Sequence, residues 1–368
     1  MQYLMDKHRL QQILSMEIPI ITHKDWDGLC SAALLKGVMN KELGIRIKDN
    51  RILFSQPNQI LDESKVQIFD RARGRGITRP LSDRAFVMLD LPFKYGTKLW
   101  IDHHEGHSLP KNELRGCDLY YFDETCQSAV QLLARLFLKE YNLRISEEIV
   151  SFSDRFDSGT LGKQYELEDL DSIPPINKLG YIVEFFNTME DFPVLFHIIN
   201  LIAANYEDLE SINDPLIDSY YRKVIDQRKK GRELIKDSEY YKRLLIIDLS
   251  NRDGPFTIAN RDITPLFHQY IKKERNIRDD SVLGYFLIRH PNKGRISARL
   301  ALIWWFDERL VRLQNDKRLN IRHIGQSFGG EGHFDVVGFI FAETEKSKVL
   351  NKIKSDWDAL LKNWEIED

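Results

Sequence analysis

The most constraining feature of this sequence is a set of short apolar strands in its N-terminal half, each followed by acids or histidines. The strands and the residues that follow them are Ile18–Thr22 before His23, Asp25 and Asp27, Ala85–Leu89 before Asp90, and Lys98–Ile101 before Asp102, His103 and His104. Helical periodicity runs from Leu29 to about Asn40 and from Ser128 to Tyr141. Strands that alternate with helices predict an α/β fold with a doubly wound, mostly parallel sheet.

The acids and histidines that follow these strands indicate a metal site. Parallel strands bring their carboxyl ends to one edge of the sheet, where ligands bind. A single Asp after a strand usually caps the next helix, but three strands that do this together, with histidines beside them, exceed what capping needs. Crowded carboxylates cost several kcal/mol unless a cation neutralises them. Asp and His ligands without thiolate suit manganese, magnesium, iron or cobalt better than structural zinc.

Length and composition set the broader expectations. A chain of 368 residues predicts two domains. We expect a metal-binding domain at 1–205, a helical linker at 206–240 and a smaller α/β substrate-binding domain at 241–368, with the active cleft between the two domains. The absence of a membrane-spanning run or signal peptide, and three cysteines without a CxxC pair, predict a cytoplasmic protein with no membrane partner. The net charge of −3 favours small substrates over long nucleic acid.

Four motifs together resemble those of the DHH phosphoesterase superfamily. They are His23-x-Asp25-x-Asp27-Gly28, Asp90, Asp102-His103-His104 and Asp157-Ser158-Gly159. The superfamily includes RecJ exonucleases, nanoRNases and cyclic-dinucleotide phosphodiesterases. The fourth motif follows a helix that we expect from Ser146 to about Ser153, and Asp154 competes with Asp157 for its place.

This resemblance implies a centre of two divalent cations, with manganese favoured over magnesium or cobalt. The implied ligands are His23, Asp25 and Asp90 for one ion, and Asp27, Asp90, His103 and Asp157 for the other, with Asp90 bridging. Asp102, His103 and His104 form the catalytic motif, in which Asp102 orients a histidine or acts as a distal ligand and His104 faces the substrate phosphate. The alternate spacing of 23, 25 and 27 predicts an extended loop around one centre. His107 is interpreted as a loop histidine.

The C-terminal half resembles the DHHA1 substrate-binding domain. The resemblance rests on Gly294-Arg295-Ile296-Ser297-Ala298-Arg299 and on Ser327-Phe328-Gly329-Gly330-Glu331-Gly332-His333. It implies that Arg299, Gly329, Gly330, Gly332 and His333 bind substrate together with His104. Arginine suits a phosphate because its planar fork donates two parallel hydrogen bonds. The sequence departs from the pattern at Glu331, where a glycine is expected, and an acid there would bring negative charge close to a bound phosphate.

These features predict a metal-dependent phosphodiesterase that hydrolyses short RNA or DNA oligonucleotides, or dinucleotides, to mononucleotides through a water activated by two metal ions. A competing hypothesis is a RecJ-like exonuclease on longer single strands, which an arginine-rich loop between 71 and 84 would favour, although such a loop is more simply a solvated surface. A nucleotide 3′,5′-bisphosphate phosphatase and an inactive scaffold of a replication complex are two further hypotheses. The resemblance also suggests a homodimer.

Overall fold

The computed structural model describes most of the chain. The described residues are 7–57, 60, 65–70, 75–81, 85–104, 107, 109, 113–157, 173–188, 191–210, 212–236, 238–250, 283–288, 294–302, 313, 320–332 and 336–364. The chain divides into two compact units, Met1–Val224 and Ile225–Asp368. The second unit begins inside helix α8 (Pro215–Lys236), which lies in the stretch predicted as a linker. Each unit is described by itself below.

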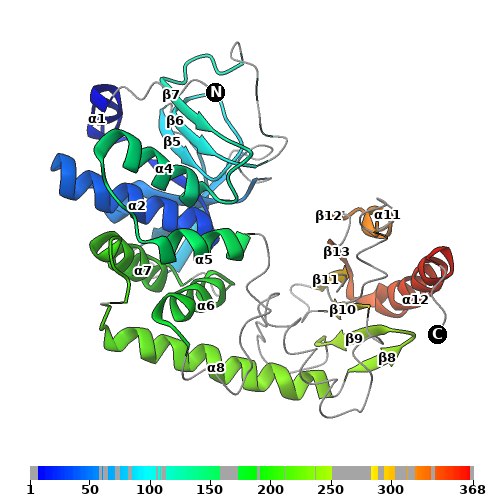
Figure 1. The fold of residues 1–368 in the computed structure, drawn as a ribbon. Coiled ribbons are helices and arrows are strands. Elements are labelled where there is room, and N and C mark those ends of the chain that lie inside the picture. Colours follow the sequence, from blue (N-terminus) through cyan, green and yellow to red (C-terminus); the bar gives the residue numbers. More distant parts are fainter. Residues whose placement is uncertain are drawn as a thin grey trace. The chain divides into compact units, whose positions relative to one another are not determined.

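The first unit is built on a mostly parallel sheet. Its seven described strands lie in the order β4-β3-β2-β1-β5-β6-β7 (Figure 1). Their bounds are β1 Ile20–His23, β2 Ile52–Ser55, β3 Lys65–Asp70, β4 Arg75–Pro80, β5 Phe86–Leu89, β6 Thr97–Asp102 and β7 Leu119–Phe122. Strands β2, β1, β5, β6 and β7 pair in parallel, whereas β3 and β4 form an antiparallel extension at one edge. The predicted fold class, a doubly wound and mostly parallel α/β sheet, is therefore confirmed.

Helices cover this sheet and surround one central helix. They are α1 Lys7–Ser15, α2 Trp26–Leu43, α4 Ala129–Tyr141, α5 Glu147–Asp157, α6 Pro175–Thr188 and α7 Phe192–Asn205, with a 3-10 turn at Asp49–Arg51. Helix α2 contacts β1 and β5 and is itself flanked by α4, α5, α6 and α7 (Figure 1). Its buried residues lie on all sides, as expected for a helix enclosed by protein. At Gly37 a methyl group would lie 2.4 Å from the carbonyl oxygen of Ala203, so the small residue lets α7 approach closely.

Helix α2 begins earlier than the periodicity predicted. The side chain of Asp25 accepts a hydrogen bond from the backbone of Gly28 and thereby caps the helix, which starts at Trp26. Gly44, with φ of 65°, ends it in the left-handed conformation. Asp27 consequently lies in the first helical turn. The predicted extended loop through residues 23, 25 and 27 is therefore wrong, because the cap turns the chain into a helix directly after Asp25.

Two more sequence expectations need correction. Helix α5 runs to Asp157, four residues beyond the predicted end at Ser153, because Phe152 and Phe156 continue its apolar face into the core. The predicted arginine-rich loop contains strand β4, which carries Arg75 and Arg79 and pairs with β3 from end to end. The remaining arginines of that stretch, at 71, 73 and 84, lie outside the described residues.

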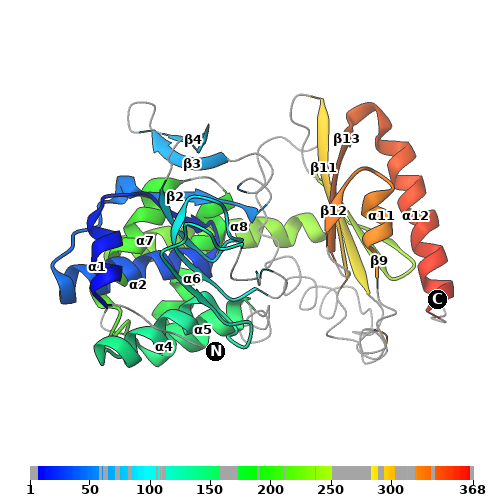
Figure 2. The same cartoon turned by 90° about the horizontal axis from the view of Figure 1, so that it is seen from above.

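The second unit contains a smaller sheet. Its described strands are β8 Glu239–Tyr241, β9 Leu244–Asp248, β10 Gly284–Ile288, β11 Arg295–Leu302, β12 Glu331–Gly332 and β13 Val336–Ala342, in the order β12-β13-β11-β10-β9-β8. Only β9 and β10 pair in parallel among these strands. Helices α11 (Arg322–Gln326) and α12 (Lys346–Asn363) lie beside this sheet (Figure 2). They contribute to one core with it, in which Ile353 and Trp357 of α12 are fully buried. This second, smaller sheet with its helices confirms the smaller C-terminal α/β domain of the predicted fold class.

Across the described part of the chain, none of the helices has the length and apolar character needed to cross a bilayer.

Candidate metal centre

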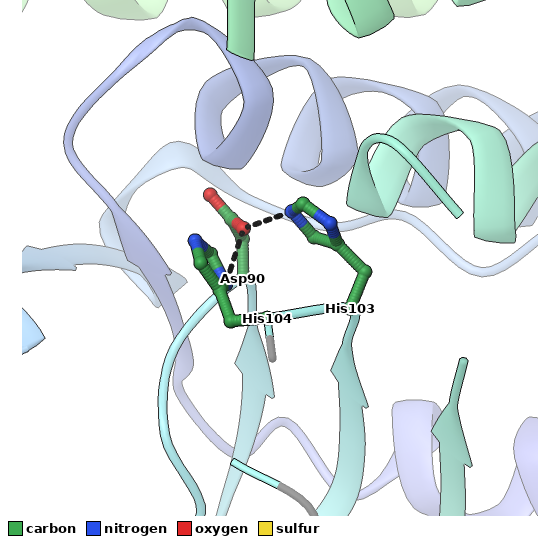
Figure 3. A group of neighbouring side chains, drawn as sticks. All are labelled: Asp90, His103 and His104. Atoms are coloured by element: carbon green, nitrogen blue, oxygen red, sulfur yellow. Dashed lines mark ion pairs between the residues drawn. The ribbon is translucent and has the colours of Figure 1, made fainter. Parts of the chain in front are cut away.

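Side chains from five elements meet at the carboxyl edge of the first sheet. His23 ends β1, Asp90 directly follows β5, and His103 and His104 follow β6, while Asp27 and Asp157 come from the first turn of α2 and the end of α5. Figure 3 shows Asp90 between the two imidazoles of His103 and His104. Three ligand groups on this edge have the proximity that a metal ion requires: His23, Asp25, Asp90; Asp90, His103, His104; and Asp102, His104, His107.

Asp90 is the central residue of the site. It is 1% exposed, and neither of its carboxylate oxygens has a hydrogen-bond partner among the described residues. Its φ of 56° is left-handed, a conformation that costs a non-glycine residue roughly 1 kcal/mol or more. The backbone is held there by a hydrogen bond from its N–H to the carbonyl of Ile101, at 2.8 Å. A strained backbone that presents two unpaired buried oxygens is typical of a functional site.

The imidazole of His103 is oriented by a hydrogen bond to a backbone carbonyl. Its Nδ1 lies 3.3 Å from the carbonyl oxygen of Cys126 and donates to it, so Nε2 is the nitrogen that can bind a cation once its proton has left. That Nε2 faces carboxylate oxygens of Asp27, Asp90 and Asp157 at 3.5, 3.5 and 3.6 Å. These separations are long for hydrogen bonds, and Nε2 has no hydrogen-bond partner among the described residues. Ligands of one ion with bonds of about 2.1 Å lie roughly 3.0–3.4 Å apart, so a small contraction would close the set around a cation.

Asp27 is fully buried and anchored to the start of helix α4. Its two oxygens accept hydrogen bonds from the backbone N–H groups of Ala129 and Val130, at 2.7 and 3.0 Å. A helix N-terminus favours a carboxylate, and these bonds fix both oxygens in place. Burial, together with the neighbouring charge of Asp90, nevertheless raises the pKa of Asp27 to about 7. The metal-free site therefore disfavours the ionised form of this group.

His23 and Asp25 form the other side of the site. His23 Nδ1 lies 3.0 Å from Asp25 Oδ2 and 3.5 Å from Asp90 Oδ2, and its Nε2 lies 3.0 Å from Gln56 Oε1. Burial opposes the charged imidazole, but the carboxylates of Asp25 and Asp90 raise the pKa of His23 well above its usual value. Burial also opposes the charged form of His103, but the carboxylates of Asp27 and Asp90 raise its pKa to about 11. Protons on these histidines thus balance the carboxylates in the metal-free protein.

Asp102 acts on two histidines at once. Its Oδ1 lies 2.8 Å from His104 Nδ1, its Oδ2 lies 2.6 Å from His107 Nδ1, and Oδ1 also accepts from the backbone of His103. The Asp102 carboxylate raises the pKa of His104 to about 9, against the effect of burial. His107, interpreted as a loop histidine, does lie outside any helix or strand, and its ring is held by the same buried carboxylate as that of His104. In the third group, Asp102, His104 and His107, the side chains already bind one another through these short hydrogen bonds, so this group does not need a metal ion.

The two candidates for the fourth motif differ in their contacts. Asp157 Oδ2 faces His103 Nε2, and burial and the charge of Asp27 raise the pKa of Asp157 to about 6. Asp154 lies one helical turn earlier and accepts hydrogen bonds from Ser128 and Gln131, at 2.6 and 2.8 Å. Asp154 therefore fastens α5 to the start of α4, and the geometry favours Asp157 as the residue that faces the centre.

The donor set fits two divalent cations. His23, Asp25 and Asp90 lie close enough together to hold one ion. Carboxylate oxygens of Asp27, Asp90 and Asp157 lie 3.5–3.6 Å from His103 Nε2, so these four side chains could hold a second ion. The buried Asp90 oxygens, His23 Nδ1 and His103 Nε2 lack hydrogen-bond partners in the described chain, and the mixed nitrogen and oxygen donors suit manganese or magnesium. A cation that replaces the protons of these histidines would remove the cost of the crowded carboxylates.

In the second unit, the arginine predicted to bind substrate lies on strand β11. Arg299 pairs with Gly338 of β13, and its half-buried side chain has a buried Nε without a hydrogen-bond partner among the described residues. Ser297 lies on the same face two residues earlier.

The glycine turn near Arg299 has a steric role. The N–H groups of Gly329 and Gly330 donate to the carbonyls of Gln326 and Gly325, so both are engaged within the turn. Gly329 is left-handed, with φ of 69°, and a methyl group at Gly330 would lie 2.2 Å from the carbonyl oxygen of Gly338. Gly332 forms part of β12, whereas His333 and the side chain of Glu331 lie outside the described residues.

Sequence reasoning missed two groups that orient the site. Gln56 contacts His23, and the backbone carbonyl of Cys126 orients His103. Gln56 had one signal in the sequence. It is a polar residue directly after a short strand, Ile52–Ser55, and the recognised ligands also follow short strands. A backbone carbonyl leaves no trace in the residue type, so Cys126 could not have been found.

The fold and this constellation together define a DHH-type α/β architecture, and comparison with known proteins agrees. No protein-family model and no curated protein matches the chain. Among solved structures, the pGpG-specific phosphodiesterase PggH from Vibrio cholerae matches with a TM-score of 0.62 and 15% identity, over 93% of this chain and 99% of that one. The DHH domain of a protein described as belonging to a family of ribosomal proteins matches with a TM-score of 0.52 and 12% identity, over 95% of this chain and 88% of that domain.

RecJ from Thermus thermophilus, solved with Mn²⁺, also matches, with a TM-score of 0.46 and 12% identity, over 96% of this chain and 55% of RecJ. At these identities the two matches with TM-scores above 0.5 establish the fold alone. The chain has the fold of DHH-domain proteins, and the resemblance drawn from its motifs is confirmed at that level.

Proposed function

We propose that the chain is a metal-dependent phosphodiesterase that hydrolyses dinucleotides and short oligonucleotides to mononucleotides. The observation that carries the proposal is the Asp90 centre: two buried oxygens on a left-handed residue, which face imidazole nitrogens at ion-pair distance but have no hydrogen bond among the described residues. Buried polar groups are normally satisfied, so this arrangement calls for a cation.

Two bound divalent cations would supply an activated water and neutralise charge on the phosphoryl group. The residues of this chain have separate tasks. His23, Asp25, Asp27, Asp90, His103 and Asp157 hold the ions, and the start of α4 fixes Asp27 in place. Asp102 accepts the Nδ1 proton of His104, whose raised pKa keeps the ring protonated at neutral pH. The remaining Nε2–H of His104 can then donate to a phosphate oxygen or to the leaving oxygen.

The second unit contributes substrate recognition in this proposal. Arg299 offers its guanidinium to a phosphate group on the face of β11 that it shares with Ser297. Gly330 lets the adjoining turn lie close to β13, and Gly329 supplies the left-handed backbone of that turn. His333 and Gly332 remain candidate contacts on the basis of the motif.

Short substrates are favoured by two observations. The chain carries a net charge of −3, whereas grip on long nucleic acid needs a basic surface. Arg79, from the stretch that would have supported a RecJ-like exonuclease, is a half-buried residue of a paired strand. The pGpG specificity named for PggH makes a linear dinucleotide the first substrate to test.

The test is a time course on 5′-labelled RNA and DNA, from dinucleotides to long strands, with Mn²⁺, with Mg²⁺ and with chelator. We expect rapid metal-dependent cleavage of the shortest substrates while long strands are spared. Loss of the long strands at comparable rates would favour a RecJ-like exonuclease. Absence of cleavage with either metal would refute both activities.

A further inference from the structure

Gln56 reaches the metal centre from a strand that carries none of the recognised motifs. Strands β1 and β2 pair in parallel with His23 opposite Ser55, so Gln56 is the first residue beyond that pair. Its backbone is held in place, since the N–H of Ile60 donates to the Gln56 carbonyl at 2.9 Å and the Ser55 hydroxyl donates to the carbonyl of Lys65 at 2.9 Å. The register of the sheet thus brings the Gln56 side chain beside the His23 ring.

The contact selects one form of the imidazole. Gln56 Oε1 lies 3.0 Å from His23 Nε2, and an amide oxygen can only accept a hydrogen bond. The proton must therefore be on Nε2. A neutral imidazole carries one N–H, so its lone pair is then on Nδ1, the atom that lies 3.0 Å from Asp25 Oδ2 and 3.5 Å from Asp90 Oδ2.

The opposite side of His23 is restrained by Gly28. A methyl group at Gly28 would lie 2.4 Å from the carbonyl oxygen of His23 and 2.8 Å from its Cβ. The hydroxyl of Thr22 donates to the Gly28 carbonyl at 2.5 Å and closes this turn. Gly28 therefore sets the position of the residue, and Gln56 sets which nitrogen of the ring is free.

We propose that Gln56 is a positioning residue that holds His23 in the tautomer whose Nδ1 binds the first divalent cation. The inference rests on the metal centre of the proposed function. Without the Gln56 oxygen, the competing tautomer gains a hydrogen bond from Nδ1–H to the Asp25 carboxylate, and that proton blocks the lone pair. Loss of such a supporting group typically lowers metal affinity by about 10- to 100-fold.

The test compares Mn²⁺ titrations of metal-stripped wild type, Gln56→Leu, Gln56→Glu and a control, Gln12→Leu, on the exposed face of α1. In Gln56→Leu we expect one ion to bind roughly 10- to 100-fold more weakly and the other to change less. Gln56→Glu keeps an acceptor for Nε2–H and should retain nearly wild-type affinity. Gln12→Leu should match wild type.

A second readout reports the tautomer directly. In Mg²⁺-loaded, ¹⁵N-histidine-labelled protein, the His23 signals, assigned with His23→Asn, should show a protonated Nε2 in wild type and Gln56→Glu, and a loss of that state in Gln56→Leu. Equal affinity and the same tautomer in Gln56→Leu and wild type would overturn the inference, as would a Gln56→Glu variant as weak as Gln56→Leu. If wild type itself bound no divalent cation, the proposed function would fail before Gln56 was tested.

Discussion

Replacement of Asp27 with Asn should change the stability of the metal-free protein in opposite directions at high and low pH. The pKa of Asp27 is raised from 3.8 to about 7, so in the folded protein the ionised form is disfavoured by about 4 kcal/mol. Because the folded pKa of this acid is raised, wild type loses stability as pH rises from about 3.8 to about 7, and the loss is complete above that range. Asn carries no charge and escapes this cost.

The variant also loses a contact. Asn keeps one oxygen for the start of α4 but turns an NH₂ group toward the second backbone N–H, which costs about 2 kcal/mol. At pH 8 the free energy of unfolding of metal-free Asp27→Asn should exceed that of wild type by about 2 kcal/mol. Near pH 4 it should be lower than that of wild type by about 2 kcal/mol. Addition of Mn²⁺ should stabilise wild type far more than the variant, because a ligand is lost.

The assay is urea unfolding after metal removal, followed through tryptophan fluorescence, since Trp26 and Trp100 are buried in the same unit. Asp154→Asn is the matched control: Asn keeps one oxygen acceptor but loses one of the two hydrogen bonds from Ser128 and Gln131, so this variant should lower stability at pH 8, the opposite sign to Asp27→Asn. An effect of Asp27→Asn that keeps one sign at both pH values would refute the reasoning.

Further predictions concern metal and substrate. Asp157→Asn should weaken Mn²⁺ binding more than about tenfold and Asp154→Asn should not, and the reverse order would reassign the fourth motif. Mn²⁺ affinity should rise by at least about tenfold per pH unit from about pH 6 to 8, because the proton of His103, and below about pH 7 that of Asp27, must leave on metal binding; a flat profile would contradict this. Asp102→Asn should lower kcat by about 10- to 100-fold with both ions still bound, as measured by steady-state kinetics and dialysis. Arg299→Gln should raise KM without changing the metal count, and an unchanged KM would exclude Arg299 from substrate binding.

Much of this architecture could be predicted because the signals are local. The apolar, β-branched runs before His23, Asp90 and Asp102 mark buried parallel strands, and parallel strands must bring their carboxyl ends together. The recognised motifs therefore converge as expected. Hydrophobic periodicity from Ser128 to Tyr141 also located α4, which the structure shows at Ala129–Tyr141 with Ser128 as its N-cap.

The parts that could not be predicted depend on contacts between distant segments. Strand β4, with its arginines and proline, carries no buried-strand pattern because it lies at the sheet edge and pairs on one side. Asp25 caps helix α2 and Asp27 lies in its first turn, and only the structure shows that the chain becomes helical between them. Gln56 reaches His23 through the register of β1 and β2, across a separation of 33 residues.

The most direct test of the central claim is the number of Mn²⁺ ions bound per chain, measured by equilibrium dialysis of wild type and Asp90→Asn. Asn tolerates the left-handed backbone of position 90 and preserves its volume, but it removes the charge that both ions are proposed to share. The account predicts two ions in wild type and loss of both at the same free metal concentration in Asp90→Asn. No binding in wild type, or two ions retained in the variant, would contradict it.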